Sequence, residues 1–173
     1  MKNFKITSVE DGKEYWISRA HAVVGCIVDE NNRLLLERRG KGCPDHVGKL
    51  AFPCGYLDWG ETRLQAIKRE IFEELGLNIS ENLDATTKEW CTIDNPEADA
   101  RENIVTRYII RYPELEKRLD DIKKYINTSE LRGGEAEEVS EVLLLTPEEA
   151  LSLDDAEFAF NHRELIVDLL SKL

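Results

Sequence analysis

The sequence predicts an α/β fold in which helices cover both faces of a central mixed sheet. Strand-like apolar runs and segments with helical apolar spacing follow one another in mixed order along the chain. This order suits a single sheet with helices on both sides. The 173 residues suffice for one domain with a well-filled core. No internal repeat or low-complexity tract divides the chain.

The N-terminal part predicts mainly strands. Residues 1–17 form a polar extension, with a possible strand pair around the turn at Asp11-Gly12. Residues 22–28 are an apolar strand, and residues 33–37 are its hairpin partner across an Asn-Asn turn. Residues 40–48 are rich in glycine and charge. They predict a loop that can border a substrate.

The clearest helix signal lies at residues 62–75. Leu64, Ile67, Ile71 and Leu75 recur at three- and four-residue spacing and form one apolar stripe. Gly76 is a favourable C-terminal stop, because glycine enters the left-handed cap without strain.

The rest of the sequence predicts two further strands and three further helices. Residues 85–92 and 104–111 predict strands, and residues 113–126 predict an amphipathic helix within an inserted segment, 113–134. This insertion serves either core packing or a dimer contact. Thr146-Pro147-Glu148-Glu149 predicts a helix start, and Asn161 is expected to cap a final helix. His162 can stack on a base, but a structural role is favoured.

Three glutamates crowd the end of the predicted 62–75 helix: Glu70, Glu73 and Glu74, beside Arg69. Like charges at this spacing destabilise a helix by roughly 0.2–0.5 kcal/mol per pair. Acids near the C-terminal end also oppose the helix dipole, by about 0.3–1 kcal/mol each when exposed. Two interpretations remain open, a solvated charged face and a divalent metal site. Mg²⁺ prefers such carboxylates together with substrate phosphates.

The spacing of these acids belongs to a longer pattern, G-x5-E-x7-R-E-U-x-E-E-x-G-U, where U is aliphatic. Its fixed positions are filled by Gly55, Glu61, Arg69, Glu70, Ile71, Glu73, Glu74, Gly76 and Leu77. Residues 55–77 therefore resemble the box of the Nudix hydrolase family. The resemblance implies the Nudix fold, an α/β/α sandwich with a central mixed sheet, over most of residues 18–173.

The resemblance also implies an activity and a set of roles. Such enzymes cleave a nucleoside diphosphate linked to another group, with Mg²⁺ as cofactor and Mn²⁺ as a possible substitute. Glu70 and Glu74 are implied as direct metal ligands, Glu73 as a direct or water-mediated ligand, and the carbonyl of Gly55 as another. Arg69 would hold a glutamate by a charge-assisted hydrogen bond. Glu61 would brace the loop against the helix.

A general base is expected from a loop far along the chain, as in much of this family. Glu135, Glu137 and Glu138 precede the apolar run at residues 142–145. Glu138 is the preferred candidate and Glu137 the second. Two alternatives remain open: these acids are merely solvated, or the base lies within the box.

Substrate contacts are predicted at Arg38, Arg39 and Trp59. The two arginines either contact phosphates or are solvated cations, and Trp59 either faces the site or packs elsewhere. The segment at residues 158–162 is similar to that of ADP-ribose pyrophosphatases, which favours ADP-ribose or a nucleotide sugar. The alternatives are a (modified) nucleoside triphosphate, coenzyme A or a dinucleotide.

Composition limits the partners. The formal net charge is −12, with 35 acidic and 23 basic residues, and broad binding to nucleic acid or an anionic membrane needs a basic face instead. Four cysteines and three histidines make no zinc signature. No apolar run approaches the roughly 20 residues of a membrane span. We expect a cytoplasmic protein with a small-molecule substrate.

Two further expectations come from the resemblance. Relatives are commonly dimers, so a homodimer is possible. A non-catalytic nucleotide sensor is the alternative from another functional class. The sensor is disfavoured because such proteins tend to lose box glutamates, and every box acid is present here.

Overall fold

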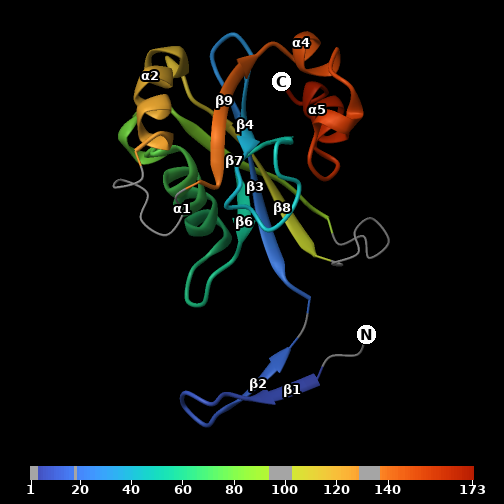
Figure 1. Cartoon of the computed structure of the whole chain (residues 1–173). Coiled ribbons are helices and arrows are strands. Elements are labelled where there is room, and N and C mark those ends of the chain that lie inside the picture. The colour runs from blue at the N-terminus through green and yellow to red at the C-terminus, as the bar shows by residue number, and fades with distance from the viewer. Residues whose placement is uncertain (1–3, 18, 94–102, 129–136) are drawn as a thin grey trace.

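The main sheet combines parallel and antiparallel strand pairs (Figure 1). The structure is a computed structural model, and it describes residues 4–17, 19–93, 103–128 and 137–173. Its seven strands follow the order β5-β4-β3-β8-β7, with β6 paired to β3 and β9 to β4. The central strands β3 (His21–Val28) and β8 (Ile104–Arg111) are parallel, and the other pairs are antiparallel. The remaining strands are β4 (Leu34–Arg39), β5 (Leu50–Ala51), β6 (Cys54–Tyr56), β7 (Thr86–Ile93) and β9 (Val139–Leu145).

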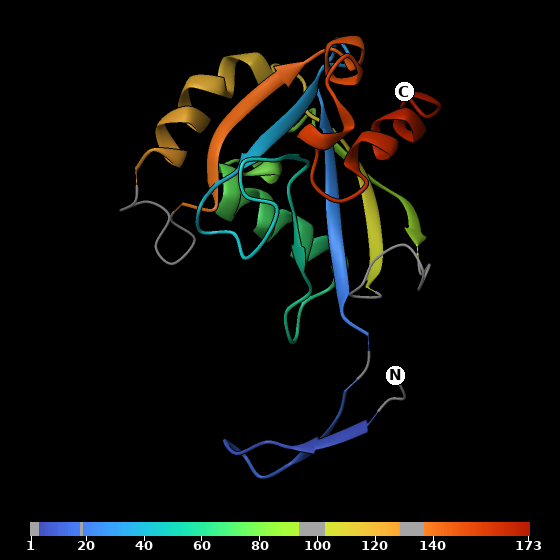
Figure 2. The ribbon, with the colours of Figure 1, turned by 45° about the vertical axis from the view of Figure 1, so that its right-hand side comes forward.

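Helices cover both faces of this sheet, as Figures 1 and 2 show. On one side lie α1 (Arg63–Leu75) and α2 (Leu115–Ile126), and on the other α4 (Pro147–Leu151) and α5 (His162–Leu170). Two short 3₁₀ helices, η1 (Ile79–Glu81) and η3 (Asp155–Glu157), complete the chain order. The predicted α/β/α sandwich is confirmed. None of the helices in the described ranges is long and apolar enough to span a lipid bilayer.

Strand β3 is buried on both faces because alternate residues point into two separate cores. Val23 and Ile27 join the core under α1, whereas Val24 and Val28 join the core under α5. A strand covered on both sides needs apolar residues at every position, which explains its continuous apolar run. The same alternation in β4 places Leu35 on the α1 side and turns its neighbours to the opposite side.

Helix α1 begins and ends where the sequence predicts. The Thr62 side chain accepts from the backbone N–H of Gln65, and the Gln65 side chain accepts from the backbone of Thr62, which forms a capping box. Gly76 closes the helix with a φ of 65°. The predicted apolar stripe is wrong at Leu64, which is 43% exposed. Ala66 is buried against the sheet instead, because the buried face is centred on Ile67 and Ile71.

Replacing Gly76 with alanine is expected to destabilise the protein. A Cβ there would lie 2.5 Å from Cγ of Tyr125 on α2, and φ is in the left-handed region. The strain alone costs about 1–3 kcal/mol, and the clash adds to it. Urea unfolding measures the loss. Gly60→Ala is the matched control, because Gly60 has a φ of 84° with no atom within 4 Å of such a Cβ. Equal losses in both variants would contradict the packing argument.

Helix α2 belongs to the core. Leu115, Ile122 and Ile126 are buried in the same core as α1, so the described part of the predicted insertion packs in the domain. Its first residue follows Glu114, which has a φ of 61°. The end of the predicted insertion, residues 129–134, lies outside the described residues.

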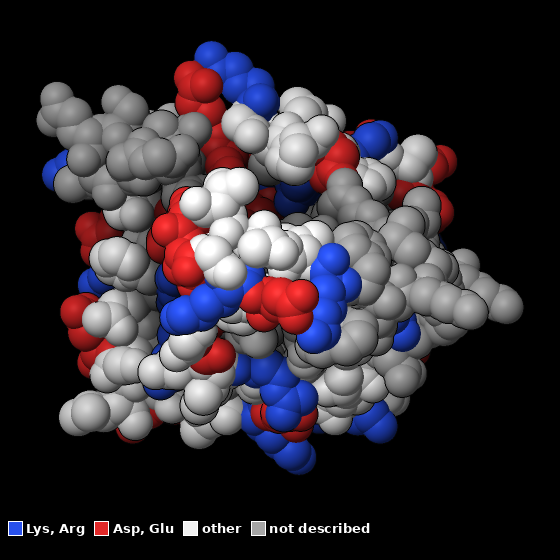
Figure 3. Space-filling view, turned by 90° about the horizontal axis from the view of Figure 1, so that it is seen from below, with Lys and Arg blue, Asp and Glu red and all other residues white. Residues whose placement is uncertain are grey.

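The N-terminal extension forms the predicted strand pair. Strands β1 (Phe4–Thr7) and β2 (Glu14–Ile17) make a two-stranded sheet of their own, which projects from the rest of the domain (Figures 1 and 2). Tyr15 contacts Trp59 with ring centroids 5.6 Å apart. Seen from this end, the described acidic and basic side chains are interspersed (Figure 3).

Candidate active site

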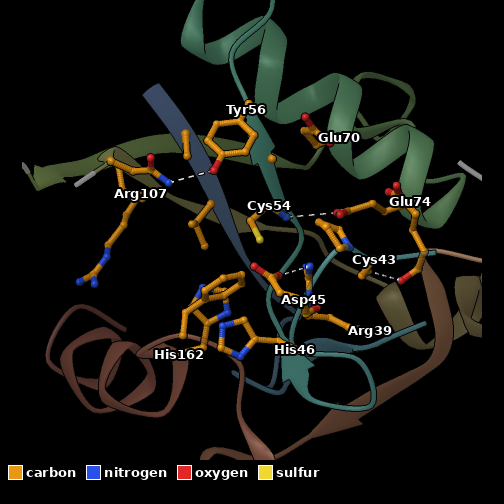
Figure 4. Close-up of a pocket in the computed structure, with 18 of the residues that line it drawn as sticks. Arg39, Cys43, Asp45, His46, Cys54, Tyr56, Glu70, Glu74, Arg107 and His162 are labelled. Atoms are coloured by element: carbon orange, nitrogen blue, oxygen red, sulfur yellow. Dashed lines mark hydrogen bonds and ion pairs between the residues drawn. The ribbon is translucent and has the colours of Figure 1, made fainter. Parts of the chain in front are cut away.

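A cavity of about 770 Å³ opens between the box, residues 55–77, and the C-terminal segment. This volume falls in the range of small-molecule sites. One part of its wall comes from β6 and α1, and the other from the loop after β4 and the turn before α5 (Figure 4). Its charged and polar lining includes Arg39, Asp45, His46, Arg69, Glu70, Glu73, Glu74, Asn103, Arg107, Glu138, Asn161 and His162.

Arg69 holds three of the predicted glutamates. Its Nε and Nη2 donate to the two carboxylate oxygens of Glu61 at 3.2 and 2.8 Å, and Nη1 donates to Glu70 at 2.9 Å and to Glu73 at 2.8 Å. Nη2 also donates to the carbonyl of Tyr56 at 2.9 Å. Such charge-assisted bonds fix side-chain orientation. The hydrogen bonds from Arg69 to Glu61 lower the pKa of the Glu61 carboxylate below its usual value.

Glu61 also fixes the loop that enters α1. Its Oε1 accepts from the backbone N–H of Asp58 at 2.8 Å. The structure thus places Glu61 between the box loop and the helix, where the resemblance implies a bracing role.

Glu74 is buried at the centre of a group of carboxylates. Burial raises its pKa well above the usual value, and the charges of Glu37, Glu70 and Glu138 raise it further. The backbone N–H of Cys54 donates to Glu74 Oε2 at 3.1 Å and orients it (Figure 4). Gly55 lies directly against Glu70, since a Cβ at Gly55 would be 2.1 Å from the Glu70 carboxyl carbon.

Glu138 reaches the cavity because its backbone is anchored to the loop after β4. Its carbonyl accepts from Gly40 N at 2.7 Å and from Cys43 Sγ at 3.1 Å. Glu137 lies outside the cavity lining, and its carboxylate pairs with Lys41 Nζ at 2.8 Å. Glu135 lies outside the described residues.

Of the predicted substrate contacts, the structure brings only Arg39 into the cavity wall. Arg38 follows the alternation of β4 to the side away from α1, where it pairs with Glu141 at 3.0 Å and with Glu157 at 3.5 Å. Trp59 is 88% exposed and contacts Tyr15 rather than the cavity. The prediction that these two residues face the site is therefore wrong for this structure.

Several residues of the site were not found from sequence. Glu37 is buried near Glu74. The sequence feature that could have identified it is an acidic residue within the apolar run of β4, on the same side of the strand as Leu35. Asp45, His46 and Phe160 line the other part of the cavity. They lie in two segments that the sequence singled out only as wholes, the loop at residues 40–48 and the segment at residues 158–162. No sequence signal identified these individual residues.

His162 has the structural role favoured from sequence. It is buried, and its Nδ1 accepts from the backbone N–H of Phe52 at 3.0 Å. Burial and the charges of Arg107 and Arg39 lower its pKa to about 3. Asn161 occupies the N-cap position of α5 without a capping hydrogen bond from its side chain.

The donor chemistry of the acidic part fits a hard divalent cation. Oxygen ligands are available from Glu70, Glu73 and Glu74 and from the main chain of Gly55, and a cation would relieve the mutual repulsion that raises the Glu74 pKa. Glu70 and Glu73 are hydrogen-bonded to Arg69 here. Each of these bonds uses one carboxylate oxygen, Oε1 of Glu70 and Oε2 of Glu73. Within the described ranges, no three His, Cys, Asp or Glu side chains are gathered as metal ligands.

Relatives of known name share parts of this sequence. An 8-oxo-dGTP diphosphatase from Escherichia coli is 38% identical over 61 residues, which cover 35% of this chain and 46% of that protein. An ADP-ribose pyrophosphatase from Methanocaldococcus jannaschii is 40% identical over 78 residues, covering 42% of this chain and 43% of that protein. The chain thus spans less than half the length of these curated relatives.

Solved structures and a family model cover most of the chain. The NUDIX domain of Shewanella oneidensis NrtR, solved with ADP ribose, has a TM-score of 0.61 at 17% identity, covering 90% of this chain and 89% of that one. A mutT/nudix family protein from Listeria innocua has a TM-score of 0.61 at 24% identity, covering 90% and 95%. These similarities show the fold. The family model of the NUDIX domain matches residues 19–169, and the chain therefore belongs to the NUDIX family.

Proposed function

We propose that this chain is a divalent-metal-dependent pyrophosphohydrolase that cleaves a nucleoside diphosphate linked to another group. The observation that carries the proposal is the convergence of Glu70, Glu74 and Glu138 on one cavity, where burial and like charge raise the pKa of Glu74. Membership of the NUDIX family supports this reaction class. Perturbed carboxylates in a cavity are typical of functional sites.

Each residue of the acidic part has a role in this proposal. Glu70, Glu73, Glu74 and the Gly55 carbonyl would hold the metal. Bound Mg²⁺, or Mn²⁺ in its place, supplies charge neutralisation at the phosphate oxygens and lowers the pKa of a water molecule. The carboxylate of Glu138 accepts the proton of the attacking water. Arg69 and Glu61 are positioning residues that orient the box carboxylates.

ADP-ribose or a nucleotide sugar is the favoured substrate class. The similarity to a relative named ADP-ribose pyrophosphatase supports it, and the cavity is large enough for two groups joined by a diphosphate. A modified nucleoside triphosphate is the alternative, supported by the relative named 8-oxo-dGTP diphosphatase.

The test is a hydrolysis assay with Mg²⁺ and with Mn²⁺ over ADP-ribose, nucleotide sugars, 8-oxo-dGTP, dinucleotides and coenzyme A, with products identified by mass. Release of a mononucleotide from ADP-ribose or a nucleotide sugar is the expected result. Metal-dependent binding of a substrate without any hydrolysis would overturn the proposal and favour a non-catalytic sensor.

Glu138→Gln is expected to lower kcat about 10²-fold or more, because glutamine cannot accept the proton. Glu137→Gln is the matched control in the neighbouring position. Its carboxylate pairs with Lys41 outside the cavity, so near-normal turnover is expected. Steady-state kinetics on the best substrate compares the two. Wild-type kcat in Glu138→Gln would place the base elsewhere, within the box.

A homodimer and a cytoplasmic location stay predictions. Light scattering of the purified chain measures the first, and fractionation of the source cells measures the second.

A further inference from the structure

The part of the cavity away from α1 is built around the ring of Phe160. Phe160 lines the cavity and is 38% exposed. It comes from the turn before α5, whereas its neighbour His46 comes from the loop after β4. Figure 4 shows His46 and His162 on one side of the cavity and the α1 residues Glu70 and Glu74 on the other. An apolar ring left facing a cavity forgoes burial that the core would give it.

Both loop residues have strained backbones. Phe160 has a φ of 53° and His46 a φ of 51°. Positive φ is uncommon outside glycine, and for a bulky residue such as Phe160 it is an outlier. Such strain costs about 1–3 kcal/mol per residue and clusters at ligand-binding sites. The two strained residues bring their rings together, with centroids 4.6 Å apart and planes tilted by 57°.

The Phe160 ring is held by neighbours that are themselves fixed. The guanidinium carbon of Arg39 lies 5.2 Å from its centroid. Arg39 in turn donates to the Asp45 carbonyl at 3.2 Å and to Asp45 Oδ1 at 3.1 Å. The His162 ring lies 5.3 Å from Phe160 and is anchored by Phe52. A ring held before the ligand arrives loses little further freedom on binding.

We infer that Phe160 is a stacking platform for a planar aromatic ring of the substrate. The substrate class is then a nucleotide whose base lies beside Phe160, and diphosphates of sugars or polyols without an aromatic ring are excluded as good substrates. An aromatic side chain binds any base through its π-face, and stacking is lost on removal of the ring. The inference rests on the proposed function for the diphosphate at the other part of the cavity.

The test is a binding experiment without catalysis. AMP, GMP, UMP, CMP and ribose 5-phosphate are titrated by calorimetry in EDTA against wild type, Phe160→Leu and Phe160→Trp. At least one mononucleotide is expected to bind wild type more tightly than ribose 5-phosphate does. Phe160→Leu keeps an apolar side chain without a π-face, so its affinity for that mononucleotide falls about 5- to 100-fold. Phe160→Trp keeps the affinity within about threefold, which separates stacking from misfolding.

Phe72→Leu is the matched control. Phe72 is 50% exposed on α1 and contacts Tyr125 outside the cavity, so all affinities stay at wild-type values. Equal affinity of wild type for ribose 5-phosphate and every mononucleotide, or equal affinity of Phe160→Leu and wild type, overturns the inference. Base binding that depends on Phe160 without any hydrolysis in the substrate assay supports the inference and removes the proposed function. Hydrolysis with an unchanged KM in Phe160→Leu supports the proposed function and contradicts the inference.

Discussion

Glu74→Gln is expected to remove hydrolysis and, at the same time, to raise the melting temperature of the metal-free protein. In the proposed mechanism Glu74 helps to hold the cation, so its loss forfeits several kcal/mol of transition-state stabilisation, which is about 10²-fold or more in rate. In the absence of metal, the same carboxylate destabilises the folded protein. It is buried, and its pKa is raised by burial and by the charges of Glu37, Glu70 and Glu138.

Glutamine removes that charge and still accepts from the backbone N–H of Cys54. For a chain of this size, each 1 kcal/mol gained raises Tm by about 2–4 °C. Calorimetry in EDTA measures the gain. Glu73→Gln is the control, because Glu73 is half-buried and is paired with Arg69. Its replacement gives no gain. A lower Tm for Glu74→Gln than for wild type in EDTA would contradict the electrostatic account.

Added metal reverses the comparison. A ligand that binds only the folded state stabilises it by mass action. Mg²⁺ is therefore expected to raise the Tm of wild type and to raise that of Glu74→Gln much less. An equal Tm increase in both proteins would place the metal elsewhere.

His162→Gln is expected to flatten the acid dependence of stability. The pKa of His162 is lowered from 6.5 to about 3 by burial and by the charges of Arg107 and Arg39. Between these two values the unfolded chain binds a proton that the folded protein excludes. Stability is therefore complete above pH 6.5 and falls as the pH drops toward 3. The slope contributed by this one group reaches about 1.4 kcal/mol per pH unit.

Urea unfolding of wild type and His162→Gln at pH 7, 6, 5 and 4 measures the difference. The variant is less stable than wild type at pH 7, because glutamine fits the site of a buried imidazole poorly. Its stability then falls less between pH 6 and pH 4. Parallel curves for the two proteins would show that His162 does not set the acid sensitivity.

The features predicted correctly from sequence are those that local rules determine. Thr62 and Gly76 bound α1 through capping chemistry, which acts over a few residues. Thr146 caps α4 with Glu149 in the same way. The apolar run at residues 22–28 predicted a strand, which the structure contains as β3. The spacing of the box acids brought Glu70, Glu73 and Glu74 to one side of α1, next to the cavity.

The features predicted wrongly or missed depend on tertiary contacts between segments that are distant in the sequence. Arg38 and Arg39 are neighbours in sequence, but strand alternation and the irregular pairing between them send their side chains to different places. The Trp59 ring contacts Tyr15 of the β1–β2 hairpin, and no local sequence pattern predicts this contact. Phe160 and His46 meet only because two loops from distant parts of the chain are brought together.

The parallel pairing of β3 with β8 has a consequence for how the chain folds. Residues 21–28 pair with residues 104–111, so the middle of the sheet closes only after most of the chain has been synthesised. Long-range parallel pairing is slow to form. Until then, β3 exposes apolar side chains on two sides, and such strands aggregate readily. We expect yield in a heterologous host to depend on growth temperature and chaperones more than the stability of the finished protein suggests.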